Sequence, residues 1–462
     1  MSVRLSERKR EPLRMGSCDP LSGTDWQSVP MSITCPGRAD AIRRNRVWLM
    51  IGSWKLAAQL STSHSSRDSL DPLRMLETVR RVQEAIDLDL LIVGFREAPE
   101  IFREFCGSRR PVGDTALWYG ALSDIEGLED SDLVVNWRGE RSRGWGGWAE
   151  KGSEVEETFR FVCPNNPSVR QKAVRRLREL LARYDFTGVF LDKIRFPSPA
   201  NGVDEMLSCF CGHCREKAAS VDLDLDSVIK ILADRAIDPC APPAGESGAG
   251  ASRWLDELFA RSPILSRFLR FRARSVAALV AELAEEARSM GRMVSLDLFS
   301  PCLAPLVGQD YKRLKQHCDW AKPMTYRLAQ GPAGLRLEIP ALIEGVASRF
   351  GLDEARIVEW SARHAAFDKE MLRETRERGV PIAFIQAEID AAVRTLAPAP
   401  VYFGLELVRQ PGVIDIDPAH VVDMVKAGRA ANAAGVVISW DLTHAPLDCV
   451  RALAEAASAG VR

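Results

Sequence analysis

The chain has 462 residues, of which 46% are apolar and 27% charged, and its formal net charge is −1. This balance is typical of a globular protein with a large core, and it provides no overall field that would attract nucleic acid or anionic lipid. No apolar run approaches the roughly 18–20 residues that a membrane helix needs, and the basic start lacks the apolar stretch of a signal peptide. We therefore expect a cytoplasmic protein without a nucleic-acid or membrane partner, and the composition leaves its oligomeric state open.

Residues 1–44 are polar and rich in Arg, Ser and Pro, and we predict a disordered leader there. From residue 45 onward, eight short apolar runs alternate with longer helical patterns, so 45–462 is predicted as one domain. The runs cover 46–54, 88–95, 114–122, 187–194, 292–300, 320–326, 400–408 and 434–442. Most of them are continuously apolar, which is typical of parallel strands covered on both faces.

Helical spacing of apolar residues predicts helices over 166–184, 267–291, 368–379, 419–435 and 447–458, the first of them capped by Asn166 or Ser168. Eight buried strands that each lead into a helix predict an α/β fold of the (β/α)₈ TIM-barrel type. A doubly wound sheet is the alternative, but no strand enters a helix through a Gly-rich phosphate loop. Two insertions interrupt the pattern, at 123–165 and at 198–265, and the second is predicted to be helical and to contain cysteines.

Acidic, basic and aromatic residues stand where the predicted strands end, which is where barrel enzymes place their active sites. They are Asp192, Arg195, Asp297, Tyr326, Arg327, Glu406, Trp440 and Asp441. Paired carboxylates suit the cleavage of a glycosidic bond, because one acid donates a proton to the leaving oxygen while the other attacks or activates water. The sequence therefore predicts a glycoside hydrolase that needs no cofactor for catalysis.

Neighbouring residues indicate which acid could be the nucleophile and which the proton donor. Arg195 favours the charged form of Asp192, which suits a nucleophile, whereas the apolar neighbours of Glu406 suit the proton donor. Asp297 is the alternative donor. The remaining candidates would orient or stack on the substrate: Arg195, Tyr326, Arg327, Trp440, Asp441 and, in the Gly-rich loop of the first insertion, Trp145.

Purely structural roles are also open to these residues. Asp192 and Arg195 could form an ion pair that caps a strand, and Trp440 with Asp441 could be a core ring beside a capping acid. The Gly-rich loop that contains Trp145 could equally form an interface patch. Two other classes of protein also remain open: a carbohydrate-binding barrel without catalysis, and a barrel enzyme acting on another small polar substrate.

The stretch "CPNNPSVRQKAVRRLRELLARYDFTGVFLDKIRFP" (163–197), followed by "CFCGHC" (209–214), resembles a family of uncharacterised glycoside-hydrolase-like barrel proteins. Their motifs are a P-N-x-P-x-V-R helix, a strand ending in G-[IV]-x-L-D-x-I-R-[FY]-P and, often, a Cys-rich segment after it. The resemblance is strongest over 160–216 and weaker through "VSLDLFSP" and "KPMTYR". It implies a TIM barrel related to retaining glycosidases with Asp192 as nucleophile, and it leaves Asp297, Glu406 and Asp441 as candidates for the acid/base.

The eleven cysteines are odd in number, so we expect reduced thiols rather than a disulfide framework. Cys209, Cys211 and Cys214 cluster, and three close thiols can hold structural zinc once a fourth ligand joins them. Cys240 and Cys163 are candidates for that ligand. Ordinary reduced cysteines are the alternative.

Overall fold

The computed structural model describes residues 54–62, 71–107, 110–123, 127–147, 158–234, 263–364 and 367–459. The predicted leader and Cys240 lie outside these residues, as does all but the last residue of the predicted strand 46–54.

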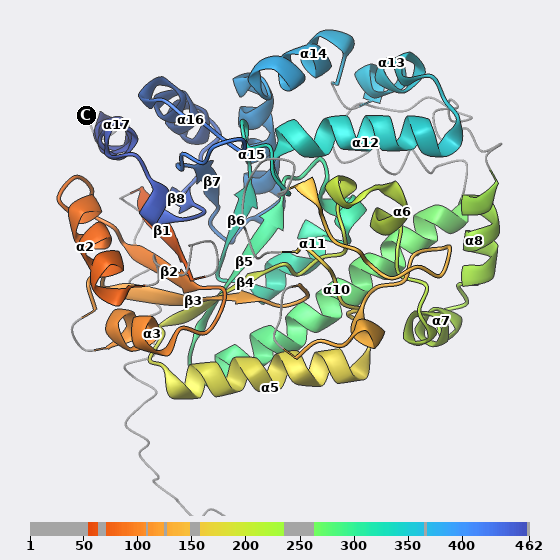
Figure 1. The fold of residues 1–462 in the computed structure, drawn as a ribbon, viewed down its shortest axis with the longest axis horizontal. Coiled ribbons are helices and arrows are strands. Elements are labelled where there is room, and N and C mark those ends of the chain that lie inside the picture. Colours follow the sequence, from red (N-terminus) through yellow and green to blue (C-terminus); the bar gives the residue numbers. More distant parts are fainter. Residues whose placement is uncertain are drawn as a thin grey trace, which may run out of the picture. The chain divides into compact units, whose positions relative to one another are not determined.

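The described residues contain eight parallel strands in the order β6-β5-β4-β3-β2-β1-β8-β7 (Figure 1). The strands are β1 (Lys55–Ser61), β2 (Leu90–Gly94), β3 (Asp114–Gly120), β4 (Gly188–Asp192), β5 (Met293–Phe299), β6 (Trp320–Met324), β7 (Tyr402–Glu406) and β8 (Gly435–Ser439). A parallel bridge between Ala321 and Val401 joins β6 to the start of β7 and nearly closes the sheet on itself. The predicted (β/α)₈ barrel is therefore confirmed.

One strand lies elsewhere than expected. The structure places β1 at Lys55–Ser61, directly after the predicted run 46–54. Its sequence, KLAAQLS, is only modestly apolar, but the ladder is well defined: Lys55 pairs with Gly435 of β8 and Ala57 with Leu90 of β2. Pairing with β2 and β8 thus decides where this strand lies, and local hydrophobicity predicted the wrong position for it.

Every strand leads into at least one helix. The helices are α2 (Pro72–Gln83), α3 (Pro99–Cys106), α5 (Pro167–Arg183), α6 (Val203–Met206), α7 (Gly212–Ala219), α8 (Leu225–Ala233), α10 (Pro263–Ser289), α11 (Tyr311–Leu314), α12 (Leu335–Phe350), α13 (Glu354–His364), α14 (Lys369–Arg378), α15 (Ile382–Leu396), α16 (Pro418–Ala430) and α17 (Leu447–Ser458). The predicted cap of α5 is present, because the Asn166 side chain accepts a hydrogen bond from the amide of Ser168. None of the described helices is both long and apolar enough to cross a bilayer.

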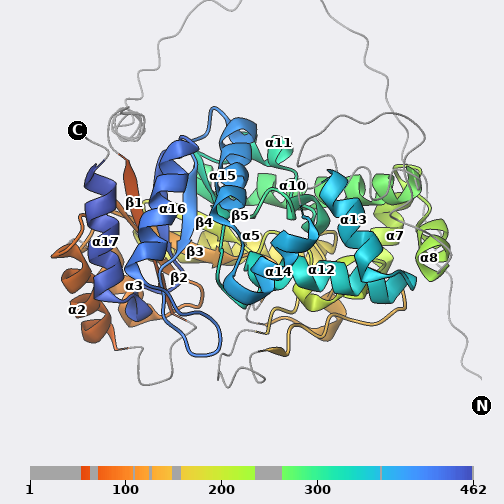
Figure 2. The same cartoon turned by 90° about the horizontal axis from the view of Figure 1, so that it is seen from above.

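The helices cover the outside of the barrel. In Figure 1 the long helices α5 and α10 run beside each other on the side of β4, and in Figure 2 α15, α16 and α17 lie side by side. Alternate residues of each strand face these helices. On β4, for example, Val189 and Leu191 belong to the main hydrophobic core between sheet and helices.

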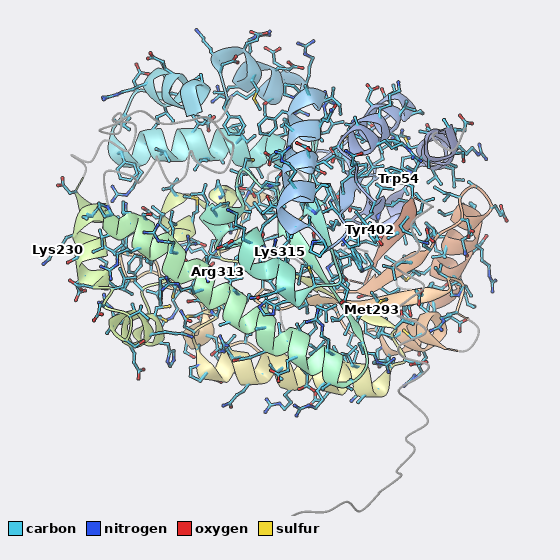
Figure 3. All side chains as sticks on the ribbon, turned by 180° about the vertical axis from the view of Figure 1, so that it is seen from behind. Trp54, Lys230, Met293, Arg313, Lys315 and Tyr402 are labelled. Carbon is cyan, nitrogen blue, oxygen red and sulfur yellow. The ribbon has the colours of Figure 1, made fainter. Side chains whose placement is uncertain are left out.

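The other residues of each strand face the barrel interior, where aromatic rings fill the end at which the strands begin. Phe190 stacks on Trp320 at 5.6 Å between ring centroids, and Trp320 stacks on Tyr402 at 4.8 Å. Figure 3 labels Tyr402, the first residue of β7. This aromatic floor leaves the opposite end of the interior to polar side chains.

The two insertions pack against each other beside β4. In the first, Leu133 bridges to Val162 and Ser123 to Phe161, so it folds back on itself as short antiparallel pairs. The second contains α6, α7 and α8, which confirms its predicted helical character. The amide of Phe210 donates to the carbonyl of Val135 at 2.8 Å and joins the two insertions.

We expect Trp320→Ala to lower the free energy of unfolding by about 3–5 kcal/mol, because it removes the central ring of the floor and leaves a cavity. Chemical denaturation followed by circular dichroism measures this loss. Leu73→Ala on α2 is the control: Leu73 is 73% exposed, so its removal should change the free energy by less than about 0.5 kcal/mol. Equal effects of the two substitutions would contradict the role given to the floor.

Candidate active site

A cavity of about 70 Å³ opens where the strands end, directly above the polar part of the barrel interior. It has room for several water molecules. Its lining consists of Gln59, Trp118, Phe159, Asp192, Lys193, Arg195, Asp297, Met324, Tyr326, Ala329, Gly331, Pro332, Ala333 and Trp440. Five of the residues predicted from strand ends are therefore brought together here: Asp192, Arg195, Asp297, Tyr326 and Trp440.

Asp192 is the last residue of β4 and lies beside Gly120 of β3 in the sheet. Its two carboxylate oxygens accept different hydrogen bonds, one from the indole Nε1 of Trp118 at 2.9 Å and one from the backbone amide of Lys193 at 2.5 Å. The carboxylate is 7% exposed and forms part of the cavity wall. Two donors from different elements thus fix the plane in which this carboxylate lies.

Asp297 reaches the same cavity from β5, and the sheet register places Lys322 of β6 beside it. The Lys322 ammonium is fully buried and donates to Oδ2 of Asp297 at 3.0 Å, to Oε1 of Gln59 at 2.8 Å and to the Tyr326 hydroxyl at 2.8 Å. Oδ1 of Asp297 is also buried, and no described residue is hydrogen-bonded to it. One oxygen is therefore held by the lysine, whereas the other has no hydrogen-bond partner among the described residues.

The surroundings of Asp297 favour its protonated form. Burial raises the pKa of the Asp297 carboxyl to about 8; the positive charge of Lys322 opposes this shift, and the negative charge of Asp192 adds to it. Both carboxyl groups line the same cavity, so the charge of Asp192 acts on Asp297. At neutral pH Asp297 can therefore donate a proton into the cavity.

Two buried cations complete the wall next to Asp192. The guanidinium of Arg195 lies between the rings of Phe161 and Phe299, at 4.4 and 4.5 Å from their centroids. The Lys193 ammonium lies over the ring of Phe159 at 4.0 Å, and Lys193 adopts a φ of +51°. Aromatic faces stabilise both cations, so positive charge is held in a fixed place at the cavity.

Trp440 and Tyr326 form the aromatic side of the cavity. Their rings meet edge to face, with centroids 5.8 Å apart, and Trp440 is only half-buried. Tyr326 is 5% exposed, and burial raises the pKa of its hydroxyl well above the usual value. The phenol therefore stays protonated and can both accept from Lys322 and donate to a partner.

Glu406 ends β7 as predicted, but it is not among the described residues that line this cavity. Its Oε1 accepts from the amide of Leu328 at 2.5 Å and lies 3.7 Å from Nε2 of His420. Burial raises the pKa of Glu406 to about 8 and lowers that of His420 to about 4, so both are neutral at pH 7 and form no ion pair. Glu406 thus faces the loop after β6 and helix α16.

Three further sequence candidates also lie outside the set of described residues that line the cavity. Arg327 borders a separate groove together with His420. Asp441 caps the turn after β8, where its Oδ1 accepts from the amide of Thr443 at 3.0 Å and from its hydroxyl at 2.8 Å. Trp145 packs edge to face on Phe159 at 6.5 Å and therefore supports a lining residue.

Among the polar and aromatic residues that line or support the cavity, sequence reasoning missed Gln59, Trp118, Phe159, Lys193 and Lys322. Lys322 carried the clearest signal, because a lysine inside the apolar run WAKPM has to be paired if the strand is buried. Gln59 lay outside the predicted first strand. Phe159 belongs to an insertion, whose course the sequence pattern does not reveal.

The cysteine cluster gains a fourth member. The Sγ atoms of Cys163, Cys209, Cys211 and Cys214 all lie within 4.8 Å of one another. Cys163 was one of the two candidates for the fourth ligand, and the other, Cys240, lies outside the described residues. None of the four lines the cavity described above.

A larger cavity of about 260 Å³ lies against α5, where Glu97, Lys172 and Arg176 are among its lining residues. Its acid Glu97 is already engaged, since it accepts from Arg176 in the same lining and from Arg183 outside it. Glu97 and Glu179 are its only acids among the described lining residues. We therefore assign the chemistry to the smaller cavity, where two acids interact above the barrel interior.

No protein-family model matches the sequence, and a search of curated proteins finds no match. Among solved structures, the fold is similar to the PgaB (BpsB) glycoside hydrolase domain from Bordetella bronchiseptica, with a TM-score of 0.52 and 12% identity over 88% of this chain and 99% of that domain. The spore cortex-lytic enzyme SleL from Bacillus megaterium QM B1551 aligns with a TM-score of 0.44 and 11% identity over 87% of this chain and 74% of that one. At such identities the likeness to the PgaB domain is one of fold.

We expect the raised pKa of Asp297 to make the protein less stable as the pH rises from 5 to 8. In this range the folded state keeps a proton on Asp297 and the unfolded state does not, so unfolding releases a proton and becomes easier at higher pH. Asp297→Asn removes this proton, so the variant should gain stability relative to the parent as the pH rises. Denaturation at pH 5 and pH 8 measures the difference. Leu73→Ala alters no titratable group, so its stability should change with pH in the same way as that of the parent. The same pH dependence of stability in Asp297→Asn as in the parent would contradict the raised pKa of Asp297.

Proposed function

We propose that the protein is a glycoside hydrolase that uses Asp192 as nucleophile and Asp297 as the acid/base. The observation that carries this proposal is the pair of interacting carboxyl groups at one cavity, one fixed by two N–H donors and the other with a pKa raised to about 8. Glycosidic cleavage requires such a division between an acceptor and a proton donor. The similarity in fold to a glycoside hydrolase domain supports the same chemistry.

In the first step, an oxygen of Asp192 attacks the anomeric carbon while the bond from that carbon to the leaving oxygen breaks. Oδ1 of Asp297 gives its proton to the leaving oxygen, because Oδ2 is engaged by Lys322. In the second step, water attacks the anomeric carbon and breaks its bond to Asp192, and Asp297 takes up a proton from that water. Both acids then return to their starting states.

The other residues of the cavity have supporting roles in this proposal. Lys322, which Gln59 holds in turn, keeps Asp297 in place, and the half-buried ring of Trp440 offers a face on which a sugar can stack. Arg195 and Lys193 place positive charge beside Asp192, where it can stabilise negative charge on the acid or on substrate oxygens. Glu406, the proton donor favoured from sequence, faces Leu328 and His420 instead, so the proposal assigns that role to Asp297.

Substitution of the two acids should affect turnover in different ways. We expect Asp192→Asn to abolish hydrolysis of every glycoside that the parent cleaves. Asp297→Asn should slow hydrolysis by about 10²–10⁴-fold for a glycoside with a poor leaving group and by much less for a dinitrophenyl glycoside, which departs without a proton. The measurement is kcat/KM on matched pairs of substrates.

Glu406→Gln is the control for these variants, and circular dichroism verifies that each one is folded. It should retain activity within about tenfold of the parent, because Glu406 does not face the cavity. Turnover by Asp192→Asn, or a loss in Glu406→Gln as large as in Asp297→Asn, would contradict the assignment. Glycan binding by calorimetry without any hydrolysis would instead favour the carbohydrate-binding barrel.

We expect the first product to keep the anomeric configuration of the substrate, because attack by Asp192 followed by attack of water inverts the anomeric centre twice. Proton NMR during the first minutes of hydrolysis, before mutarotation, distinguishes the two anomers. An inverted product would show that Asp192 activates water and is not the nucleophile.

A further inference from the structure

Four cysteines from two separate insertions point their sulfur atoms at one place. Cys163 lies shortly before α5, whereas Cys209, Cys211 and Cys214 lie between α6 and the first turn of α7. The Sγ of Cys163 is 3.4 Å from that of Cys214 and 3.5 Å from that of Cys211. Four thiolates at about 2.3 Å from a tetrahedral zinc ion would be about 3.8 Å apart. The sulfur spacing is therefore close to that of a zinc tetrathiolate.

Backbone and side-chain N–H groups point at the sulfurs. The amide of Val135 donates to Cys209 at 3.3 Å and the amide of Asn165 to Cys163 at 3.4 Å. The side-chain amide of Asn165 also donates to Cys214 at 3.3 Å. Such donors stabilise negative charge on sulfur and orient metal ligands. Such donors would support the thiolate form, which is the form in which cysteine binds metal.

A buried arginine supplies positive charge next to the cluster. Arg272 of α10 is 0% exposed, and its guanidinium donates to the carbonyls of Leu306 and Met206 at 2.8 and 2.6 Å. No carboxylate in the described part of the chain pairs with it, but it interacts electrostatically with Cys209 and Cys214. A zinc tetrathiolate carries two negative charges and would offset this buried positive charge.

Neither disulfide bonds nor a metal ion that prefers oxygen ligands accounts for the cluster as well as zinc does. The Sγ distances of 3.4 and 3.5 Å are too long for disulfide bonds, which join sulfurs at about 2.05 Å and only in pairs. Calcium and magnesium prefer oxygen ligands, whereas four thiolates in a tetrahedron are typical of zinc or iron, and the metal analysis below distinguishes these two. Four protein ligands also fill a tetrahedron and leave no position for water or substrate, which indicates a structural rather than a catalytic ion.

We propose that Cys163, Cys209, Cys211 and Cys214 together bind one zinc ion, which fastens the two insertions to each other beside β4. Cys163 lies two residues after Phe161, whose ring packs on Arg195, and four residues after Phe159, which lines the cavity. The ion would therefore hold one wall of the cavity in place. This proposal does not depend on the glycosidase assignment, since the ion takes no part in that reaction.

The first test uses the full chain purified without chelator from medium containing zinc. Elemental analysis should give one zinc ion per chain. Titration with a mercurial thiol reagent should release that zinc as four thiols react, and replacement by cobalt should give the visible bands of tetrahedral tetrathiolate coordination. No stoichiometric metal, iron in place of zinc, or a disulfide among the four cysteines would each overturn the proposal.

The second test assigns the ligands. Cys163→Ser and Cys211→Ser should lose zinc to a chelator concentration that the parent withstands, and their cobalt spectra should change to those of a site with fewer thiolates. Cys318→Ser is the matched control, because Cys318 is also buried and free but lies outside the cluster. Zinc retention by both cluster variants, or equal loss in Cys318→Ser, would overturn the assignment. If a variant does not fold, the mercurial titration of the parent still decides whether four thiols hold the ion.

Discussion

The arrangement at the cavity depends on one buried lysine. Lys322 is fully enclosed in the barrel, where an ammonium without partners would cost several kcal/mol. The register between β5 and β6 places it beside Asp297, and Gln59 and Tyr326 provide its other oxygen acceptors. Because this lysine occupies Oδ2 of Asp297, the acid keeps one orientation, and only Oδ1 has no hydrogen-bond partner among the described residues. The chemistry of the cavity thus depends on a hydrogen-bond network inside the barrel, above the aromatic floor.

The sequence predicted most of the barrel because its strands are buried on both faces and read as apolar runs. β4 and β5 lie within the expected stretches, and α17 has the predicted bounds of 447–458. β1 was misplaced because its inward positions hold small or polar residues, such as Ala57 and Gln59, which interrupt the apolar run. That strand is specified by its pairing with β2 and β8, a long-range constraint that no local pattern contains.

Because a residue ends a strand, the sequence predicted that it lies at the end of the barrel that holds the cavity. It did not predict which way the side chain points. Asp192 and Asp297 reach the cavity because donors on the adjacent strands hold them there, Trp118 on β3 and Lys322 on β6. Glu406 occupies a comparable position, but the amide of Leu328 draws it toward the loop after β6. Apolar neighbours correctly indicated a raised pKa for Glu406, since burial alone produces that shift. They could not indicate which cavity, if any, the acid faces.

The walls of the cavity are held by contacts between loops that are distant in sequence. Glu338, fully buried, accepts from the amides of Ala333 and Ala200 and from the hydroxyl of Ser198, each at 2.8 Å, and so ties the loop after β6 to the loop after β4. On the other side, the first insertion presses Phe161 against Arg195. Both walls are therefore fixed by buried polar contacts and ring packing. Asp192 and Asp297 are held in place as well, so the shape of the cavity is set before a substrate binds. Charges that are already oriented in this way stabilise a transition state most effectively.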